Sequence, residues 1–246
     1  MQKLLIIPAR SGSKRIPNKN FKDFLGKPLI SYVINSAIES RLFDEVMVST
    51  NSKVYAKTAQ KLGAQVPFLR SDKNSDDFAT TADVLREVID SYKRISKEFD
   101  TICCIYPTAV LLKMASVEIG FEKLIKNKFD SVLSVKKYSH PIERALVTEN
   151  GKIRFFDSNQ TNIRTQDLID KYYDAGQFYW LKTNQFLETG KIISPNSSFV
   201  LLEDFEAQDI DEPDQWKLAE MKYRFLQFIE RNANNLNVKE TYDGVL

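Results

Sequence analysis

Small and basic residues gather in one loop near the start of the chain, between Pro8 and Asn20. The apolar run Leu4–Ile7 precedes them, so the loop is expected to follow the first strand of a sheet. Small residues let backbone N–H groups approach an anion, and lysine and arginine side chains neutralise its charge. These residue types therefore favour binding of a triphosphate. A basic surface turn without a ligand is the alternative interpretation.

The spacing within this loop excludes two common nucleotide-binding motifs. It has neither the Gly-x4-Gly-Lys-Ser/Thr order of a Walker loop nor the Gly-x-Gly-x-x-Gly order of dinucleotide sites. An NAD-linked oxidoreductase is therefore disfavoured. The order from Pro8 to Asn20, which reads Pro-Ala-Arg-Ser-Gly-Ser-Lys-Arg-Ile-Pro-Asn-Lys-Asn, is far more specific than a generic basic turn.

Asp209 and Asp211 form a second candidate site. If this stretch is extended, a period of two places both carboxylates on one face and buries Ile210 behind them. Two convergent carboxylates suit Mg²⁺, which keeps several waters and binds substrate phosphates. Capping of the helix that begins near Pro213 is the alternative. The triphosphate-type loop favours the metal, because a metal draws charge off the phosphates during transfer.

Polar residues also follow other expected strands, at the sheet edge where ligands of open α/β proteins bind. Arg70 opens a polar loop after the expected extended segment Val66–Leu69. Thr81 stands at the start of a helix, where its hydroxyl could face a base, and Tyr106 ends the most apolar strand. The one histidine, His140, has no serine or cysteine nucleophile motif near it, so we do not expect it to be catalytic.

The elements that position these residues alternate between apolar strand-like runs and segments of helical period. This pattern is typical of an α/β protein with a mostly parallel sheet covered by helices. The expected strands are 4–7, 45–50, 66–69, 101–106, 131–135, 177–181 and 199–202. Three helices are expected to begin at Pro28, at Asn51 or Ser52, and at Pro213, and two more are expected over 81–95 and 116–126. Between Tyr138 and Ala175 the alternation stops, so we expect one domain over 1–246 with an arm inserted at 138–175.

Composition excludes several classes of protein. The chain has 246 residues, enough for one large domain, and its 35 basic and 33 acidic residues leave a net charge of only +2. This balance argues against a nucleic-acid or membrane partner recognised by bulk charge. The apolar run Leu4–Ile7 is too short for a signal peptide, and Cys103 and Cys104 are expected to be buried thiols. We therefore expect a cytoplasmic protein.

Taken together, several stretches resemble the cytidylyltransferases of the acylneuraminate group, which activate nine-carbon sugar acids with CTP. The segments that carry the resemblance are 8–20, 24–32, 66–70, 103–109, 164–168, 173–180 and 209–211. Tyr-Pro-Thr-Ala at 106–109 and Asp-Ala-Gly-Gln-Phe-Tyr-Trp at 174–180 favour the pseudaminate subgroup. Val110 and Tyr173 depart from the family pattern, in which proline and histidine stand, and this puts the fine sugar specificity in doubt.

The resemblance implies a Rossmann-like nucleotide-diphospho-sugar transferase fold, a requirement for Mg²⁺ and a homodimer in which the arm reaches over the neighbour's site. It also implies roles for individual residues. Arg10, Ser13, Lys14, Lys19 and Asn20 would hold the triphosphate and cytidine, Arg70 and Thr81 would lie near the base or ribose, Asp209 and Asp211 would hold Mg²⁺, Tyr106 and Gln177 would face the sugar acid, and Arg144 and Arg164 would approach it from the partner chain.

The implied reaction is transfer of CMP from CTP to the anomeric hydroxyl of a nine-carbon keto-sugar acid. That hydroxyl attacks the α-phosphorus in line and pyrophosphate leaves, with Arg10 and Lys19 stabilising its charge. Asp211 or a metal-bound water would accept the proton. The alternatives are the same reaction on legionaminic or N-acetylneuraminic acid, and a non-catalytic nucleotide-binding subunit.

Overall fold

A six-stranded sheet forms the centre of the protein in a computed structural model that describes residues 1–156 and 164–242, with side chains up to residue 232. The strands are β1 (Lys3–Pro8), β4 (Glu45–Ser49), β5 (Thr101–Ile105), β6 (Ser131–Lys137), β9 (Tyr172–Lys182) and β10 (Ser197–Leu201). Their order is β10-β6-β9-β5-β1-β4, and β9 alone in this sheet runs antiparallel to its neighbours. The prediction of a mostly parallel α/β sheet is confirmed.

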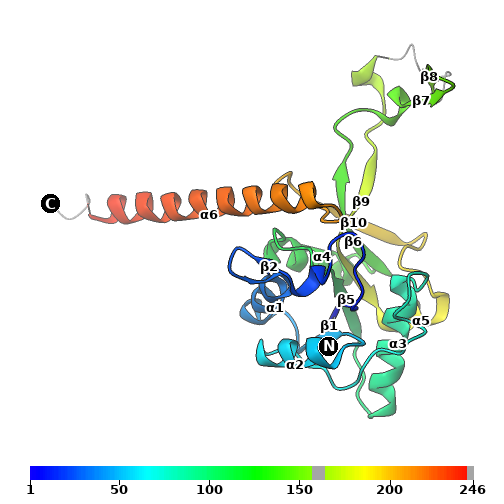
Figure 1. Ribbon diagram of the computed structural model, residues 1–246, viewed down its shortest axis with the longest axis vertical. Coiled ribbons are helices and arrows are strands. Elements are labelled where there is room, and N and C mark those ends of the chain that lie inside the picture. The colour runs from blue at the N-terminus through cyan, green and yellow to red at the C-terminus, as the bar shows by residue number, and fades with distance from the viewer. Residues whose placement is uncertain (157–163, 243–246) are drawn as a thin grey trace.

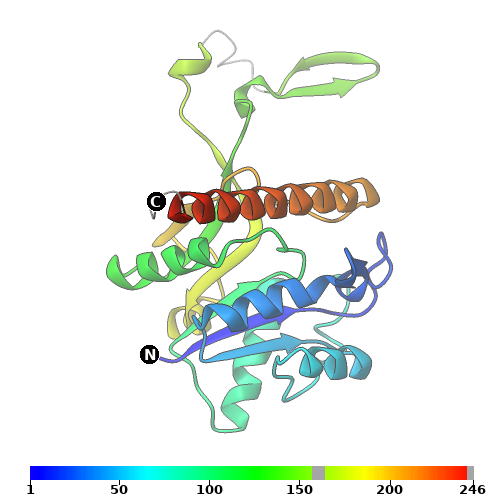
Figure 2. The same ribbon diagram turned by 90° about the vertical axis from the view of Figure 1, so that its left-hand side faces the viewer.

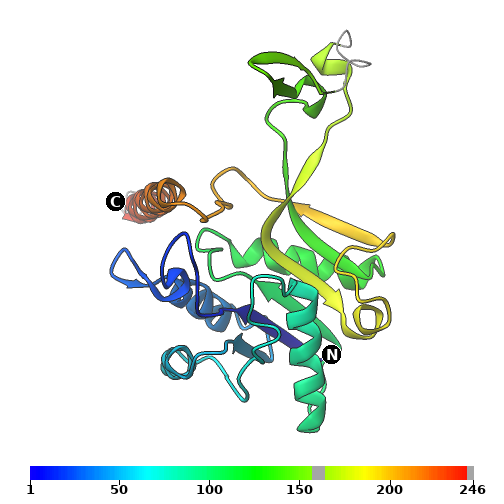
Figure 3. The same cartoon turned by 45° about the vertical axis from the view of Figure 1, so that its right-hand side comes forward.

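Helices cover both faces of this sheet (Figures 1 and 3). They are α1 (Leu29–Ser40), α2 (Lys53–Lys61), α3 (Thr81–Arg94), α4 (Met114–Lys126), α5 (Thr183–Thr189) and α6 (Pro213–Tyr242). Leu5 and Ile7 of β1 join the core beneath α1 and α4. Leu4 and Ile6 point the opposite way and join the core beneath α3 and α5, because successive strand residues alternate between faces. All four side chains are completely buried, so β1 is a central strand.

Local signals place the starts and ends of the helices that flank the first loop. The hydroxyl of Ser52 accepts a hydrogen bond from the Tyr55 amide and caps α2, and Gly63 ends that helix with φ +94°. Thr80 caps α3 in a reciprocal pair of hydrogen bonds with Asp83. The predicted boundaries of these helices are therefore correct to within one or two residues.

The expected extended segment 66–69 is not a strand, which corrects the sequence prediction. Only Gln65 forms a bridge to β4, and the chain bends at Pro67, whose nitrogen cannot donate to a ladder. The amide of Arg70 then donates to the carbonyl of Thr50 at 2.8 Å. The segment still delivers Arg70 to the carboxyl end of β4, as expected.

An arm leaves the sheet where β6 and β9 extend beyond it (Figure 1). It carries a hairpin of β7 (Leu146–Glu149) and β8 (Lys152–Phe155) and the short 3-10 turns η2 (Ile142–Arg144) and η3 (Thr165–Asp167) (Figure 2). Residues 157–163 of the expected arm lie outside the described residues. Because β9 begins at Tyr172, residues 172–175 belong to the sheet and not to the arm proper.

The C-terminal helix α6 packs on the protein through its turns between residues 216 and 226. Trp216 and Ala219 are buried against Phe24 and Ile210, whereas Phe228 is 64% exposed. Beyond these turns the helix projects from the body (Figure 1). Despite the length of α6, none of the described helices is long and apolar enough to cross a membrane.

Candidate active site

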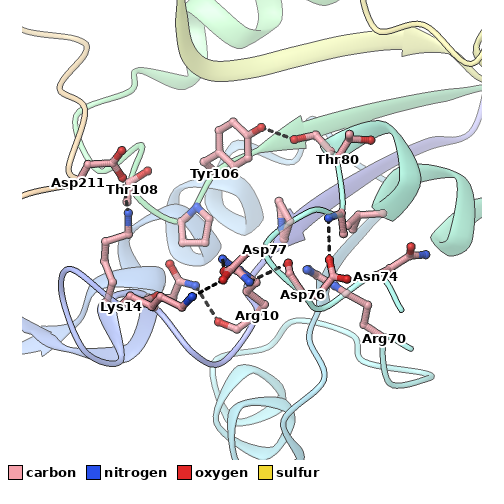
Figure 4. Close-up of a pocket in the computed structure, with 18 of the residues that line it drawn as sticks. Arg10, Lys14, Arg70, Asn74, Asp76, Asp77, Thr80, Tyr106, Thr108 and Asp211 are labelled. Atoms are coloured by element: carbon pink, nitrogen blue, oxygen red, sulfur yellow. Dashed lines mark hydrogen bonds and ion pairs between the residues drawn. The ribbon is translucent and has the colours of Figure 1, made fainter. Parts of the chain in front are cut away.

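The loop after β1, the loop before α3 and the end of β5 enclose a pocket of about 470 Å³ (Figure 4). Most of the predicted site residues line it, namely Arg10, Ser13, Lys14, Lys19, Asn20, Arg70, Thr81, Tyr106 and Asp211. These residues are far apart in the sequence. They meet because parallel strands direct the loops at their carboxyl ends to one edge of the sheet.

The loop after β1 keeps its shape through contacts with neighbouring elements. Gly12 has φ +96°, a conformation that favours glycine. The Ser11 amide donates to the side-chain oxygen of Asn51 at 2.9 Å, so Asn51 holds the loop and leaves the capping of α2 to Ser52. The Asn20 amide group donates to the carbonyl of Arg10 at 3.3 Å and closes the base of the loop.

A carboxylate of the chain itself lies between two of the predicted triphosphate-binding cations. Arg10 donates to the carboxylate of Asp77 and to the carbonyl of Asp76, both at 2.7 Å, and Lys14 pairs with the same Asp77 carboxylate (Figure 4). Hydrogen bonds from Lys14 and Arg10 lower the pKa of Asp77. The sequence analysis missed Asp77, because an acidic residue in a polar loop is usually only solvated.

Lys19 and Asp211 form the opposite wall of the pocket. The Lys19 ammonium donates to the carbonyl of Ile210 at 2.7 Å and to the Asp211 carboxylate at 2.9 Å, and Arg15 donates to the other Asp211 oxygen at 2.6 Å. Burial acts to raise the pKa of Asp211, but the hydrogen bonds and charges of Lys19 and Arg15 outweigh burial and lower it. Asp211 is therefore ionised at neutral pH.

Tyr106 brings a half-buried phenol to the pocket, and Arg70 brings a buried guanidinium. The hydroxyls of Tyr106 and Thr81 lie 2.5 Å apart, and burial raises the pKa of Tyr106 to about 12, so this phenol stays protonated. Arg70 donates from Nε to the hydroxyl of Ser49 at 3.0 Å. Burial lowers the pKa of Arg70 to about 10, which leaves the guanidinium charged at neutral pH.

A second pocket of about 570 Å³ adjoins the first and shares the wall formed by Lys19, Tyr106, Thr108 and Asp211. Asp209 lines this second pocket beside Asp211, and Ile210 between them is completely buried. The prediction that both carboxylates face one side is therefore confirmed. The remaining wall contains residues 173–176, Ala207 and Gln208 together with Lys136 and Lys222, neither of which the sequence analysis singled out.

Three predicted residues lie outside both pockets. Gln177 is 2% exposed, and its amide nitrogen donates to the carbonyl of Ala175 at 2.8 Å, while its amide oxygen has no partner among the described residues. Arg164 is on the arm, where it pairs with Asp167 at 3.3 Å. Arg144 lies in η2, also on the arm. Within one chain, neither arginine joins the other site residues.

Comparison with known proteins identifies the family of the chain that forms these pockets. A family model described as cytidylyltransferase matches residues 4–212, a range that includes every residue lining the first pocket. The chain belongs to the cytidylyltransferase family. The relationship predicted from the loop at 8–20 and the Asp209–Asp211 stretch is confirmed.

Two relatives of this cytidylyltransferase are named for pseudaminic acid and for N,N'-diacetyllegionaminic acid. It is 39% identical over 225 residues to a pseudaminic acid cytidylyltransferase of Campylobacter jejuni, a match that covers 91% of this chain and 97% of the relative. It is 34% identical over 234 residues to a CMP-N,N'-diacetyllegionaminic acid synthase of Legionella pneumophila, covering 89% of this chain and 95% of that one.

Solved structures share the fold. The structure of a CMP:2-keto-3-deoxy-manno-octonic acid synthetase complexed with CTP has a TM-score of 0.65 and 18% identity, and the match covers 92% of this chain and 99% of that one. This likeness confirms the nucleotidyltransferase fold expected from the sequence.

Proposed function

We propose that this cytidylyltransferase transfers CMP from CTP to the anomeric hydroxyl of pseudaminic acid and releases pyrophosphate. One observation carries the proposal, namely that a cation-lined pocket and a second pocket share the wall of Lys19 and Asp211. CTP in the first pocket and the sugar acid in the second would then both contact the Asp211 carboxylate and the Lys19 ammonium group. The relatives that carry the name pseudaminic acid cytidylyltransferase, at 38–39% identity, favour this acceptor over other sugar acids.

In this proposal, the residues of the first pocket bind and orient CTP. Arg10 and Lys14 exchange the Asp77 carboxylate for phosphate oxygens, and Arg70 and Thr81 lie toward the nucleoside. Holding the α-phosphorus at the shared wall turns the encounter of two substrates into an oriented in-line attack. Lys19 supplies a fixed positive charge close to where pyrophosphate leaves.

Among the described residues of the shared wall, Asp211 is the one suited to accept a proton. Asp211 is ionised and lines both pockets, whereas Tyr106 is protonated at neutral pH and cannot act as a base. We therefore assign the acceptance of the proton from the anomeric hydroxyl to Asp211.

Asp209 and Asp211 fit the role of Mg²⁺ ligands. Within the described residues, no hydrogen bond or ion pair reaches the carboxylate of Asp209, so its oxygens are available. Two carboxylates suit an ion that completes its shell with waters and substrate phosphates. Bound there, Mg²⁺ would draw negative charge off the phosphates.

The arm supports a homodimer in which Arg144 and Arg164 serve the partner's site. Its apolar side chains include Ile153 and Ile169, which are 68% and 83% exposed in one chain. Exposed apolar groups on an arm that leaves the sheet favour a partner surface. We also propose a cytoplasmic location, where buried free thiols such as Cys103 persist in reduced form.

Intersubunit complementation tests the dimer. Arg164→Ala and Asp211→Asn homodimers are each expected to lose most activity, but mixing and reassociating them should restore it. A mixed dimer then contains one site with both an intact Asp211 and an intact Arg164 from the other chain. If Arg164 instead served its own chain's site, no mixed dimer would hold an intact site and activity would not return.

The proposed reaction is tested by pyrophosphate release from CTP and Mg²⁺ with three acceptors in parallel. Release with pseudaminate, and far less with legionaminate or N-acetylneuraminate, is the expected result. Release with legionaminate alone would keep the chemistry and replace the acceptor by the kind of acid for which the Legionella relative is named. CTP binding without release for any acid would favour a non-catalytic subunit.

Asp77→Asn is expected to lower the KM for CTP about 3-fold, because it removes the anion that competes with phosphate for Arg10 and Lys14. Initial rates at saturating acceptor measure the effect. Asp72→Asn, in the same loop but outside the pocket lining, is the matched control and should leave the KM unchanged. A higher KM in Asp77→Asn would mean that Asp77 positions the two cations for CTP and does not compete with it.

A further inference from the structure

Two lysine side chains meet at the wall of the second pocket, from elements 86 positions apart in sequence. Lys136 on β6 places its ammonium 2.5 Å from the carboxylate of Asp204. Lys222 on α6 donates to the carbonyls of Asp204 and Ala207 at 3.1 and 3.2 Å. Both lysines line the pocket beside residues of the shared wall.

The charges of this pair are incompletely balanced within the described residues. Among the described residues, Asp204 is the one carboxylate paired with either ammonium, and its side chain is 90% exposed, whereas that of Lys136 is 14% exposed. Burial lowers the pKa of Lys222, and the nearby charge of Lys136 adds to the effect. Lys136 and Lys222 together with Asp204 carry one excess positive charge, and an anionic ligand in the pocket would offset it.

Lys222 lies close in the chain fold to the carboxylates of the shared wall, where the reacting atoms are proposed to be. Ala207, whose carbonyl Lys222 contacts, precedes Asp209 by two residues, and two residues of extended chain span at most about 7 Å. A carboxylate bound at Lys222 therefore lies next to the wall of Asp209 and Asp211. In a 2-keto sugar acid the carboxylate and the anomeric hydroxyl are on neighbouring carbons, so the bound carboxylate would direct that hydroxyl toward this wall.

We infer that Lys136 and Lys222 bind the carboxylate of the acceptor and make the second pocket selective for an acidic sugar. This inference rests on the proposed function and adds to it the group that the acceptor must carry. Lys222 lies beyond residues 4–212, the range matched by the family model, so α6 adds this contact to the family domain.

A purely structural role makes a different prediction. Lysines that only hold the turn 204–207 to β6 and α6 would affect stability, and their loss would not distinguish one substrate from the other. The test therefore compares the KM values of the two substrates, together with the melting temperature.

The variants for the test are Lys136→Met and Lys222→Met, with Lys217→Met, an exposed lysine on the same helix, as the control. Each pocket variant is expected to raise the KM for pseudaminate about 10-fold or more and to leave the KM for CTP within about 2-fold. Lys136→Arg, which keeps the charge, should recover most of the lost affinity. Equal changes in both KM values, or a lower melting temperature with unchanged KM values, would overturn the inference.

A neutral acceptor tests whether the two lysines recognise the carboxylate or another part of the sugar. The C1 methyl amide of pseudaminate should bind the wild-type protein and both methionine variants with similar, weak affinity in calorimetry. If the variants still lowered the affinity for the amide, the lysines would recognise another part of the sugar and the inference would fail. Because calorimetry needs no turnover, it tests the lysines even if the wild-type protein releases no pyrophosphate, a result that would overturn the proposed function separately.

Discussion

Asp211→Asn is expected to lower kcat at least about 100-fold while the protein stays folded, because it removes the charge that orients groups on both sides of the shared wall. The Asp211 carboxylate lines both pockets and accepts hydrogen bonds from Lys19 at 2.9 Å and from Arg15 at 2.6 Å. The variant loses the proposed proton acceptor and the partner that fixes Lys19. Pyrophosphate release at saturating substrates measures the change.

Asp214→Asn is the matched control, since this carboxylate is three residues away with a side chain 94% exposed. It should retain wild-type turnover.

The pH dependence of stability gives a second readout. The folded pKa of Asp211 is lowered, so its ion pairs stabilise the protein at neutral pH and lose their effect as the pH falls below about 4. The stability difference between Asp211→Asn and wild type should therefore shrink in acid. Wild-type turnover in Asp211→Asn would contradict the site assignment.

Trp180→Ala is expected to destabilise the protein by about 3–5 kcal/mol, the usual cost of emptying a buried aromatic site. Trp180 is completely buried on β9, and its indole nitrogen donates to the carbonyl of Val117 at 2.9 Å. Its ring packs against Phe43 and Phe121 at centroid distances of 5.4 and 5.0 Å. Urea unfolding measures the loss.

Trp180→Phe separates volume from the hydrogen bond, since it keeps an aromatic ring and gives up the donor to Val117. It should cost less than the alanine variant. Because β9 begins at Tyr172 and supplies residues 173–176 to the second pocket, Trp180→Ala should also weaken acceptor binding more than CTP binding. A loss below about 1 kcal/mol for the alanine variant would show that β9 is not anchored by this side chain.

Much of the fold could be predicted because its signals are local. The caps at Ser52 and Thr80 and the turn at Gly63 depend on neighbours a few residues away, and the alternation of strands and helices needs no knowledge of distant contacts. The segment 66–69 failed because β-branched and aromatic residues indicate extension, while whether a ladder forms depends on the neighbouring strand and on Pro67.

Sequence motifs were enough to identify nine of the residues that line the first pocket. The order of small and basic residues from Pro8 to Asn20 and the Asp209–Asp211 pair are contiguous motifs, and the parallel sheet brings such loops to one edge. The pairing of Asp77 with Arg10 and Lys14 depends on how the two loops pack, since no local spacing distinguishes Asp77 from a solvated acid.

The second pocket depended on tertiary structure even more. Gln177 was expected at the sugar acid, yet its side chain is buried outside both pockets. Lys136 and Lys222 each resemble an ordinary surface lysine in sequence. They become a pair only because β6, the turn 204–207 and α6 pack together, and that packing follows from burial of side chains far apart in the chain rather than from any motif.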